Sequence, residues 1–304
     1  MTPATPGTPG THPMIEMIRH WTILLIGLTL TGLICAWALP FATSPRGGVA
    51  PSLFLADAPV MATITLVLAL ALAMLVSLGV GRLTNSAVGL FVMGWGVSIF
   101  AMRTDTVHEV MLSVESNLVI LGIETLFWAM IVLVLTLVMF KIAGPFKDIH
   151  PREFETPPDP LRSPDAIKCA MAGLVMIPIV LLIAQSPSKG QVLMAVFTGG
   201  MMAGLIGRLV SPHVQPKLIF MTPIVAGAVG QFIGLIQMSR QGLNMSETFV
   251  AQAIPTLSLP MPIDYAGASL MGVAMGVGWA RSFLHHEEEE DEKKAGAGKQ
   301  TASV

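Results

Sequence analysis

Glu124 is the residue with the clearest chemical potential, because it is the only carboxylate well inside a predicted membrane-spanning segment. A carboxylate at that depth is costly unless it is protonated, paired or facing water, and such residues commonly belong to ion or solute pathways. Trp128 follows four residues later and would share the same helix face. Other polar or helix-distorting residues fall at a similar depth in four further segments: Gln231, Thr198, Thr65 and Pro178.

Together these residues predict a polar layer in the outer third of the membrane. One interpretation is a site that couples a proton or another cation to transport, with a backbone carbonyl left free by Pro178. The other interpretation is structural, in which Glu124 stays protonated and hydrogen-bonds a neighbouring helix. Both stay open at this point, and a pathway is the default expectation for an acid inside a membrane.

The usual catalytic motifs do not occur in the chain, which has no HExxH, no GxSxG, no P-loop and no pair of intramembrane aspartates. Cys35 and Cys169 both lie in apolar runs, so they predict neither a disulfide framework nor a zinc site. A lipid-modifying enzyme would require the outer residues His108, Glu109 and Asp264 to converge. We therefore predict no catalytic residue, metal site or cofactor, and an enzyme is the least favoured class.

The composition explains why these residues must be considered inside a bilayer. The chain has 304 residues, of which 53% are hydrophobic and only 12% are charged, whereas a soluble domain carries about 25% charged residues. The mean hydropathy is +0.71. The net charge of −2 offers no basic patch for nucleic acid. We therefore predict an all-α integral membrane protein that binds no nucleic acid.

Apolar runs long enough to cross a bilayer, about 20 residues each, occur about eight times along the chain. Seven spans is the competing count, because the third run is short and the eighth is glycine-rich. The predicted segments are 21–39, 59–80, 87–102, 118–140, 167–184, 192–210, 218–238 and 265–283.

The basic residues orient the predicted helices. If the N-terminus is inside, only four of the 17 Lys and Arg residues fall on the outer side: Arg46, Arg103, Lys189 and Arg240. Cytoplasmic loops carry the excess of Lys and Arg in membrane proteins. This asymmetry favours eight spans with both termini in the cytoplasm, and a prokaryotic cytoplasmic membrane as the location.

Composition shifts divide the chain into five parts. Residues 1–18 form a disordered segment rich in Thr, Pro and Gly, and residues 19–140 form a first transmembrane half of four helices. Residues 141–166 form a Pro-rich charged cytoplasmic linker before a second half of four helices, 167–283. Residues 284–304 form an acidic, polar tail that we expect to be disordered.

The two halves share features that suggest a parallel repeat. The second predicted helix ends in LGVGRL and the sixth ends in GLIGRL. Each half also has an outer amphipathic segment with capping-box spacing, Thr106 to Glu109 and Asn244 to Glu247. The alternative is that these are common features of membrane helices with no shared origin.

Three GxxxG spacings occur in the second half and predict close helix packing, because small residues let helix backbones approach in lipid. The glycines are Gly200, Gly204, Gly230, Gly234, Gly272 and Gly276. We expect the sixth, seventh and eighth segments to pack closely. The partner could lie in the same chain, in a second copy or in another membrane protein.

Two functions fit these features. The leading hypothesis is a permease- or channel-like protein for a small solute or ion, with the polar site described above. The alternative is a non-catalytic membrane subunit or scaffold of a larger complex, in which Glu124 is a buried structural group. The expected partners are the lipid bilayer and a second copy or another membrane protein.

Overall fold

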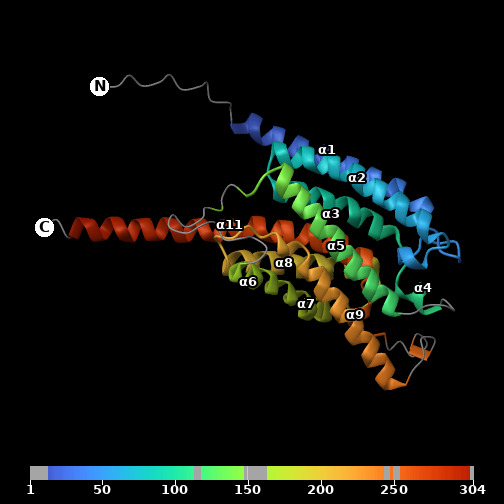
Figure 1. Ribbon diagram of the computed structural model, residues 1–304. Coiled ribbons are helices and arrows are strands. Elements are labelled where there is room, and N and C mark those ends of the chain that lie inside the picture. The colour runs from blue at the N-terminus through green and yellow to red at the C-terminus, as the bar shows by residue number, and fades with distance from the viewer. Residues whose placement is uncertain are drawn as a thin grey trace.

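The computed structural model describes residues 13–112, 118–146, 149, 163–242, 247–248 and 254–301, with side chains up to Leu284. In these ranges the protein is helical and contains no strand; the only β pairing is an isolated bridge between Thr43 and Val49. The helices pack side by side into one elongated bundle (Figure 1). The predicted all-α class is confirmed.

Ten helices have bounds within the described residues, five in each half of the chain. They are α1 (Pro13–Trp37), α2 (Pro59–Leu83), α3 (Ser86–Arg103), α4 (Val107–Leu112), α5 (Leu118–Ile142), α6 (Pro164–Met171), α7 (Met176–Ile183), α8 (Lys189–Val210), α9 (Thr222–Gln241) and α11 (Pro262–Thr301). Short 3-10 turns join some of them: η1 (Leu39–Phe41), η2 (Leu53–Leu55), η3 (Ala172–Val175), η4 (Leu218–Phe220) and η5 (Thr256–Ser258).

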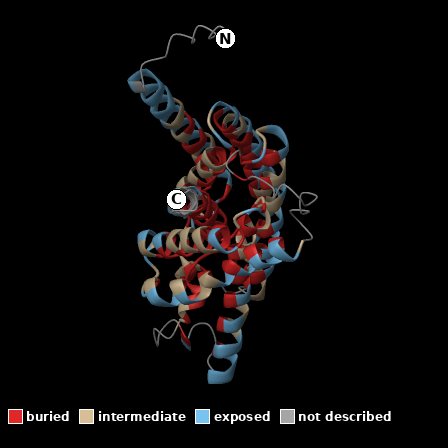
Figure 2. Ribbon diagram, turned by 90° about the vertical axis from the view of Figure 1, so that its left-hand side faces the viewer, coloured by how far each residue is buried: buried red, intermediate tan, exposed pale blue. Residues whose placement is uncertain are grey.

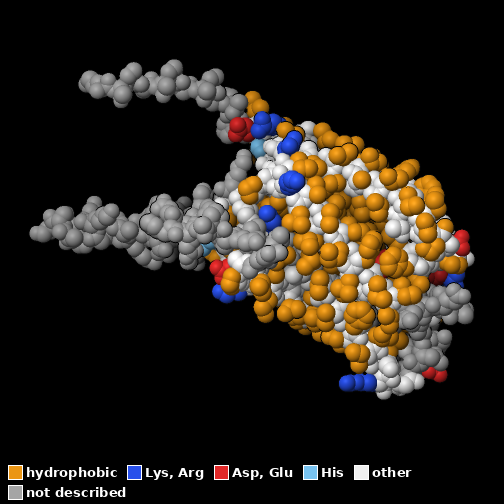
Figure 3. All heavy atoms as spheres, viewed as in Figure 1, with side chains coloured by type: hydrophobic (Ala, Val, Ile, Leu, Met, Phe, Trp, Pro, Cys, Tyr) orange, Lys and Arg blue, Asp and Glu red, His pale blue; other side chains and the backbone are white. Residues whose placement is uncertain are grey.

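In the part of the chain that the structure describes, seven helical segments are long and apolar enough to cross a membrane: α1, α2, α3, α5, α6 to α7, α8 and η4 to α9. Their outward faces form a broad hydrophobic surface between the two ends of the bundle (Figure 3). Basic side chains gather mainly at the end from which the N-terminus emerges (Figure 3). The protein is therefore a polytopic helical membrane protein.

The predicted eighth span corresponds to the first part of α11, which is not among the seven apolar segments. This helix packs against α8, α3 and α5, and residues 262–270 are all buried. The first part of α11 is surrounded by protein rather than by lipid. It can therefore be rich in Gly and Ala, because it does not need the large apolar side chains of a helix that faces lipid. Both chain ends emerge at the same end of the bundle (Figure 1), as an even number of crossings requires. The count of eight, the cytoplasmic termini and the prokaryotic location stay predictions.

Side chains at the helix starts satisfy the first free N–H groups. The Asn85 side chain accepts a hydrogen bond from the Val88 N–H at the start of α3, with an N···O distance of 2.9 Å. Ser163 accepts one from the Ala166 N–H at the start of α6, at 3.1 Å. Of the predicted linker 141–166, the structure describes residues 141–146, 149 and 163–166, and its first part is fixed by two hydrogen bonds between Phe146 and Gln215.

The fifth predicted span is interrupted rather than continuous. A 3-10 turn, Ala172–Val175, separates α6 from α7. Pro178 lacks an N–H, so it cannot bond the carbonyl of Leu174 four residues earlier, and the turn before it is tightened. Gly173 in this turn lies close to α9, because a Cβ there would be 2.3 Å from the Thr222 Oγ1.

Reciprocal glycines let α8 and α11 touch backbone to backbone. A Cβ at Gly204 would lie 2.5 Å from the carbonyl oxygen of Val273, and a Cβ at Gly276 would lie 2.0 Å from that of Met201. Gly200 and Gly272 face the opposing backbones in the same manner, at 2.8 and 2.2 Å from the Ser269 and Phe197 oxygens. These four predicted glycines therefore lie along one helix pair within the chain.

A second close contact joins the two halves of the chain. A Cβ at Gly94 of α3 would lie 2.6 Å from the Met271 nitrogen, and a Cβ at Gly267 of α11 would lie 2.7 Å from the Ser98 nitrogen. The helix α11 is thus held between α8 and α3. The predicted halves 19–140 and 167–283 share this helix contact and form one bundle.

Gly230 and Gly234 of α9 face neither α8 nor α11. A Cβ at Gly234 would lie 2.1 Å from the Ser258 Oγ, and a Cβ at Gly230 would lie 3.4 Å from the Leu257 Cβ. Both neighbours belong to η5, which precedes α11. The glycine that faces α11 is Gly227, next to the Tyr265 ring. The GxxxG spacing predicted close packing at these two glycines. The element that packs against them is the η5 turn, and not one of the two predicted helices.

The two halves pack differently despite their similar segments. The helix α2 packs on α1 and α3, whereas its counterpart α8 packs mainly on α11 and α7. The first outer amphipathic helix is present as α4, with Val107, Val110 and Met111 buried. Val114, and most of the second such segment, including Asn244, Phe249 and Val250, lie outside the described residues.

The two terminal segments contain more helix than their composition predicted. The helix α1 begins at Pro13, inside the predicted 1–18 segment, and α11 continues to Thr301 through most of the 284–304 tail. The tail carries the run HHEEEEDEKK, and Glu and Lys are good helix formers. A burial view shows α1 largely exposed along its outer face, as a helix facing lipid would be (Figure 2).

Candidate polar site at one end of the bundle

Glu124 of α5 is fully buried, at 0% exposure, and four donors surround its carboxylate. Oε1 accepts hydrogen bonds from the Leu53 N–H at 3.1 Å and from the Trp128 Nε1–H at 3.3 Å. Oε2 accepts one from the Ser52 hydroxyl and a longer one from the Phe54 N–H at 3.4 Å. The carboxylate thus joins α5 to the loop between α1 and α2.

That loop is folded so that its backbone donors reach into the bundle. The first N–H groups of a helical turn have no partner within the turn, and in η2 those of Leu53 and Phe54 are donated to Glu124. The bridge between Thr43 and Val49 closes the preceding part of the loop. The 52–54 segment therefore covers the carboxylate from this end of the molecule.

Gln231 of α9 forms a second connection beside the first. Its Oε1 accepts a hydrogen bond from the Thr125 hydroxyl at 2.7 Å, and its Nε2 donates one to the Pro260 carbonyl at 3.0 Å. Thr125 directly follows Glu124 in α5. Gln231, at 3% exposure, therefore ties α5 to the segment that leads into α11.

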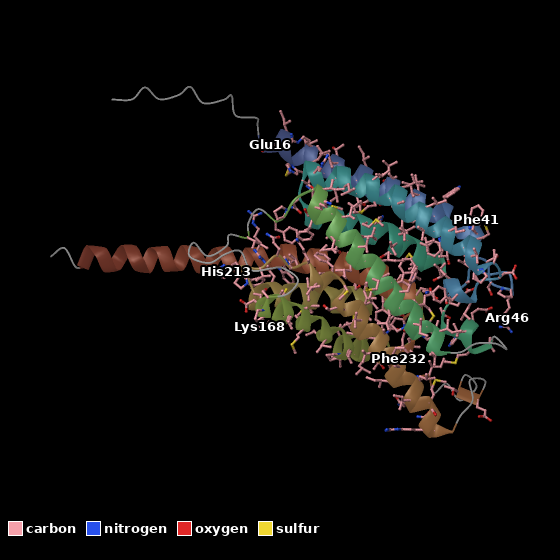
Figure 4. The ribbon with its side chains drawn as sticks, in the orientation of Figure 1. Glu16, Phe41, Arg46, Lys168, His213 and Phe232 are labelled. Atoms are coloured by element: carbon pink, nitrogen blue, oxygen red, sulfur yellow. The ribbon has the colours of Figure 1, made fainter. Side chains whose placement is uncertain are left out.

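A glycine explains how α5 and α9 come close enough for this contact. A Cβ at Gly122 would lie 2.5 Å from the Phe232 ring, so only glycine leaves room for that ring. Phe232 follows Gln231 directly and is seen on α9 on the side of α5 (Figure 4). The close approach brings Gln231 within reach of Thr125.

The structure brings together three of the four predicted pathway residues: Glu124, Trp128 and Gln231. Thr198 lies half-buried on α8, which packs on α11 and α7 rather than on α5. Thr65 is buried on α2, and Pro178 is exposed on α7. None of these three takes part in the hydrogen bonds described for Glu124 and Gln231, because equal depth does not place residues on facing surfaces.

A second buried carboxylate, Asp264, lies near the start of α11. Its Oδ1 and Oδ2 lie 2.9 and 3.0 Å from the Lys189 Nζ, and Oδ2 also accepts a hydrogen bond from the Met261 N–H at 2.8 Å. Asp264 is fully buried, whereas the Lys189 side chain is 13% exposed. The sequence analysis placed both residues in exposed outer loops. The signal that could have located Asp264 at a helix start is its position two residues after Pro262.

Further charged residues lie on loops at the same end. Glu109 accepts a hydrogen bond from the Ser44 hydroxyl at 2.8 Å and pairs with Arg46 at 3.5 Å. Burial and the neighbouring Glu109 charge raise the pKa of Asp105, which the Lys189 ammonium opposes. Arg46 lies at the end of the bundle opposite Glu16, Lys168 and His213 (Figure 4). Glu109 and Asp264, two of the three residues of the lipid-enzyme hypothesis, thus have different partners.

Comparison with known proteins adds no relative. No known protein family matches the chain, no curated protein matches it, and no solved structure matches it. Function is therefore argued from the hydrogen-bonded groups around Glu124 and Asp264, within a protein whose seven apolar helices identify it as a polytopic membrane protein.

Proposed function

We propose that the protein is a permease for a small solute or ion, with its polar site in the outer third of the bilayer. The observation that carries the proposal is the convergence of buried polar groups from both halves of the chain at one end of the bundle. Glu124, Gln231 and Asp264 are each 3% exposed or less. Ionisable side chains inside helical bundles mark ion and solute pathways.

The backbone around these groups also supports a pathway. The carboxylates of Glu124 and Asp264 and the Gln231 amide all bond the backbone of segments that precede a helix, at Leu53, Met261 and Pro260. Irregular backbone at membrane depth is tolerated where protein buries it or where it lines a cavity. In transporters such segments lie beside the substrate site.

In this conformation the site is covered. The 52–54 segment occupies both oxygens of Glu124, so a solute arriving from that end reaches Glu124 only after this segment moves. Local opening of a loop costs less than unfolding of a helix. We therefore assign the 52–54 segment as the cover of the site on its outer side.

The alternative function, a non-catalytic membrane subunit, has one observation in its favour. Both oxygens of Glu124 are already used by internal donors, as expected for a group that only fixes the fold. In that case the protein moves no solute by itself and co-purifies with a membrane partner in fixed stoichiometry.

Reconstitution tests the proposal. The full chain is inserted into phosphatidylethanolamine–phosphatidylglycerol vesicles that contain a pH-sensitive dye, and Na⁺ or K⁺ gradients are imposed. We expect proton movement driven by one of these gradients, and at least about a tenfold loss in Glu124→Gln, because an amide cannot carry the proton that a carboxyl group carries.

Glu16→Gln is the matched control, because Glu16 is an exposed carboxylate at the opposite end of the bundle (Figure 4). It should leave the flux unchanged. Absence of flux in the wild-type protein, together with a stoichiometric partner in a mild-detergent pull-down, would replace the permease by the subunit. Equal flux in wild type and Glu124→Gln would remove Glu124 from the pathway.

A further inference from the structure

We propose that Asp264 binds a monovalent cation in exchange for the ammonium group of Lys189, so that Lys189 serves as a tethered substitute for the ion. This inference rests on the proposed permease function, for which it names the class of ion and the residues that bind it. Its test measures binding and not flux, so the two proposals can fail separately.

Asp264 is the fixed partner of the pair. It lies in the first turn of α11, where free N–H groups favour a negative charge, and the Met261 N–H donates to its Oδ2 at 2.8 Å. Its side chain is 0% exposed, so it cannot turn towards water. When Lys189 leaves, the carboxylate stays buried and needs another positive charge.

Lys189 is the mobile partner. It is the first residue of α8, where the helix end repels a cation rather than attracting it. Its side chain is partly exposed. The flexible stem of a lysine can carry its ammonium from such a position to water.

Asp105, on the loop after α3, is a second carboxylate that the charge of Lys189 influences. It is half-buried, and the Lys189 charge opposes the rise in its pKa that burial and Glu109 cause. A Lys189 ammonium that leaves Asp264 on this side therefore remains under the influence of another negative charge.

The charge balance selects a monovalent ion. Lys189 neutralises one negative charge at Asp264, and an ion of the same charge leaves the buried site neutral. A divalent ion would leave an excess positive charge in a low-dielectric environment, which is costly. Among the described residues no group of three or more His, Cys, Asp and Glu could hold a metal ion, so the carboxylates that a divalent ion requires are not gathered here.

The first test uses the wild-type chain. Purified protein in lipid nanodiscs is acetylated with an amine reagent at constant pH and ionic strength, in NaCl, KCl or choline chloride, and each lysine is quantified by mass spectrometry. We expect Na⁺ or K⁺ to raise the labelling rate of Lys189 about threefold or more over choline, because the displaced ammonium becomes accessible.

Lys168 is the internal control. It pairs with Asp165 at 2.8 Å, but the two side chains are 62% and 55% exposed, so its labelling should be the same in all three salts. Equal labelling of Lys189 in all three salts would overturn the proposal. A second series at lower pH serves as a check: if Lys189 labelling relative to Lys168 is equal in the three salts but rises as the pH is lowered, the exchange is with a proton, and the proposal is overturned.

Two variants sharpen the result. Lys189→Met keeps the apolar stem and removes the competing charge, so we expect thermal stabilisation by Na⁺ or K⁺ at about tenfold lower salt than in wild type. Asp264→Asn should lose the stabilisation, and Lys168→Met should behave as wild type. If Asp264→Asn does not fold, Lys189→Met decides alone. The absence of any stabilisation by Na⁺ or K⁺ in Lys189→Met would contradict a cation site.

Discussion

The two buried carboxylates of this protein are stabilised in opposite manners. Glu124 is surrounded by four uncharged donors, two of them from the backbone of η2. Asp264 has one backbone donor and one cation, Lys189. Both side chains are 0% exposed. Glu124 thus ties α5 to its loop through uncharged donors, whereas Asp264 ties the start of α11 to the start of α8 through an ion pair.

The surroundings of the two sites differ accordingly. The donors to Glu124 lie on a short turn and on its own helix, so the site can open when one loop moves. Asp264 lies on a helix held by close backbone contacts at Gly272 and Gly276, and its side chain is fully buried, whereas the side chain of Lys189 is partly exposed. The predictions below test this contrast, from the largest expected effect to the smallest.

Lys189→Met should have the largest effect. In choline chloride it leaves the Asp264 carboxylate buried without a cation, and breaking such a pair costs about 3–5 kcal/mol. Asp264→Asn should cost less, because the partly exposed Lys189 can reach water. Unfolding free energies from detergent titration would measure both. A larger loss in Asp264→Asn than in Lys189→Met would reverse the assignment of fixed and mobile partners.

Gly276→Ala should be the next most damaging change. The new Cβ would lie 2.0 Å from the Met201 carbonyl oxygen, and separating the helices costs about 1–3 kcal/mol. Gly278→Ala is the matched control on the same helix, because its Cβ would meet nothing within 4 Å. It should be neutral or stabilising by about 0.5–1 kcal/mol. Equal effects of the two changes on thermal unfolding would contradict the close contact.

Ser52→Ala should have a moderate effect that is confined to the loop. It removes one donor to Glu124, and loss of a hydrogen bond to a buried charged group costs about 1.5–3 kcal/mol. We expect faster hydrogen exchange of the Leu53 and Phe54 amides and no change around Asp264. Ser282→Ala, at an exposed serine on α11, is the control. Unchanged exchange at both amides would show that the loop does not depend on Glu124.

The pH dependence of Asp105 should give the smallest effect. Its pKa is raised in the folded state, so the folded protein binds more protons, and this contribution to stability is lost as pH rises from about 4 through the raised pKa. Asp105→Asn should remove this decrease. Thermal unfolding followed across that range would measure it. A wild-type contribution that increases with pH would have the wrong sign.

Sequence reasoning located Glu124 and Gln231 by depth but could not find all their partners. Trp128 was found because residues four apart share a helix face. Ser52 was missed because it lies in a loop, and the sequence does not show that this loop folds back onto Glu124. Thr125 was missed because nothing in the sequence distinguishes it from other threonines in apolar helices. Thr198, predicted at the same depth, takes no part in the hydrogen bonds of Glu124 and Gln231, because the depth of a residue along a helix does not define the direction of its side chain around the helix axis.

The Asp264–Lys189 pair illustrates the same limit more strongly. The two residues are 75 positions apart, and each reads as an exposed rim residue by itself. Only the packing of α8 on α11 buries them together. The glycine spacings predicted close packing of the sixth, seventh and eighth segments. The structure shows it for the four glycines of α8 and α11, whereas Gly230 and Gly234 of α9 face the η5 turn. Spacing shows that close approach is tolerated but not which element approaches.

The sequence by itself predicted a helical membrane protein with about eight apolar segments, of which seven are long and apolar enough to cross a membrane in the described part of the structure, and it singled out Glu124 as an acid inside one of them. These properties depend on local hydropathy and helix length. The tertiary structure alone decided that Glu124 is enclosed by a loop, that Asp264 is paired with Lys189, and that α11 packs between α8 and α3. Those contacts join residues distant in the chain, whose approach depends on packing rather than on local composition.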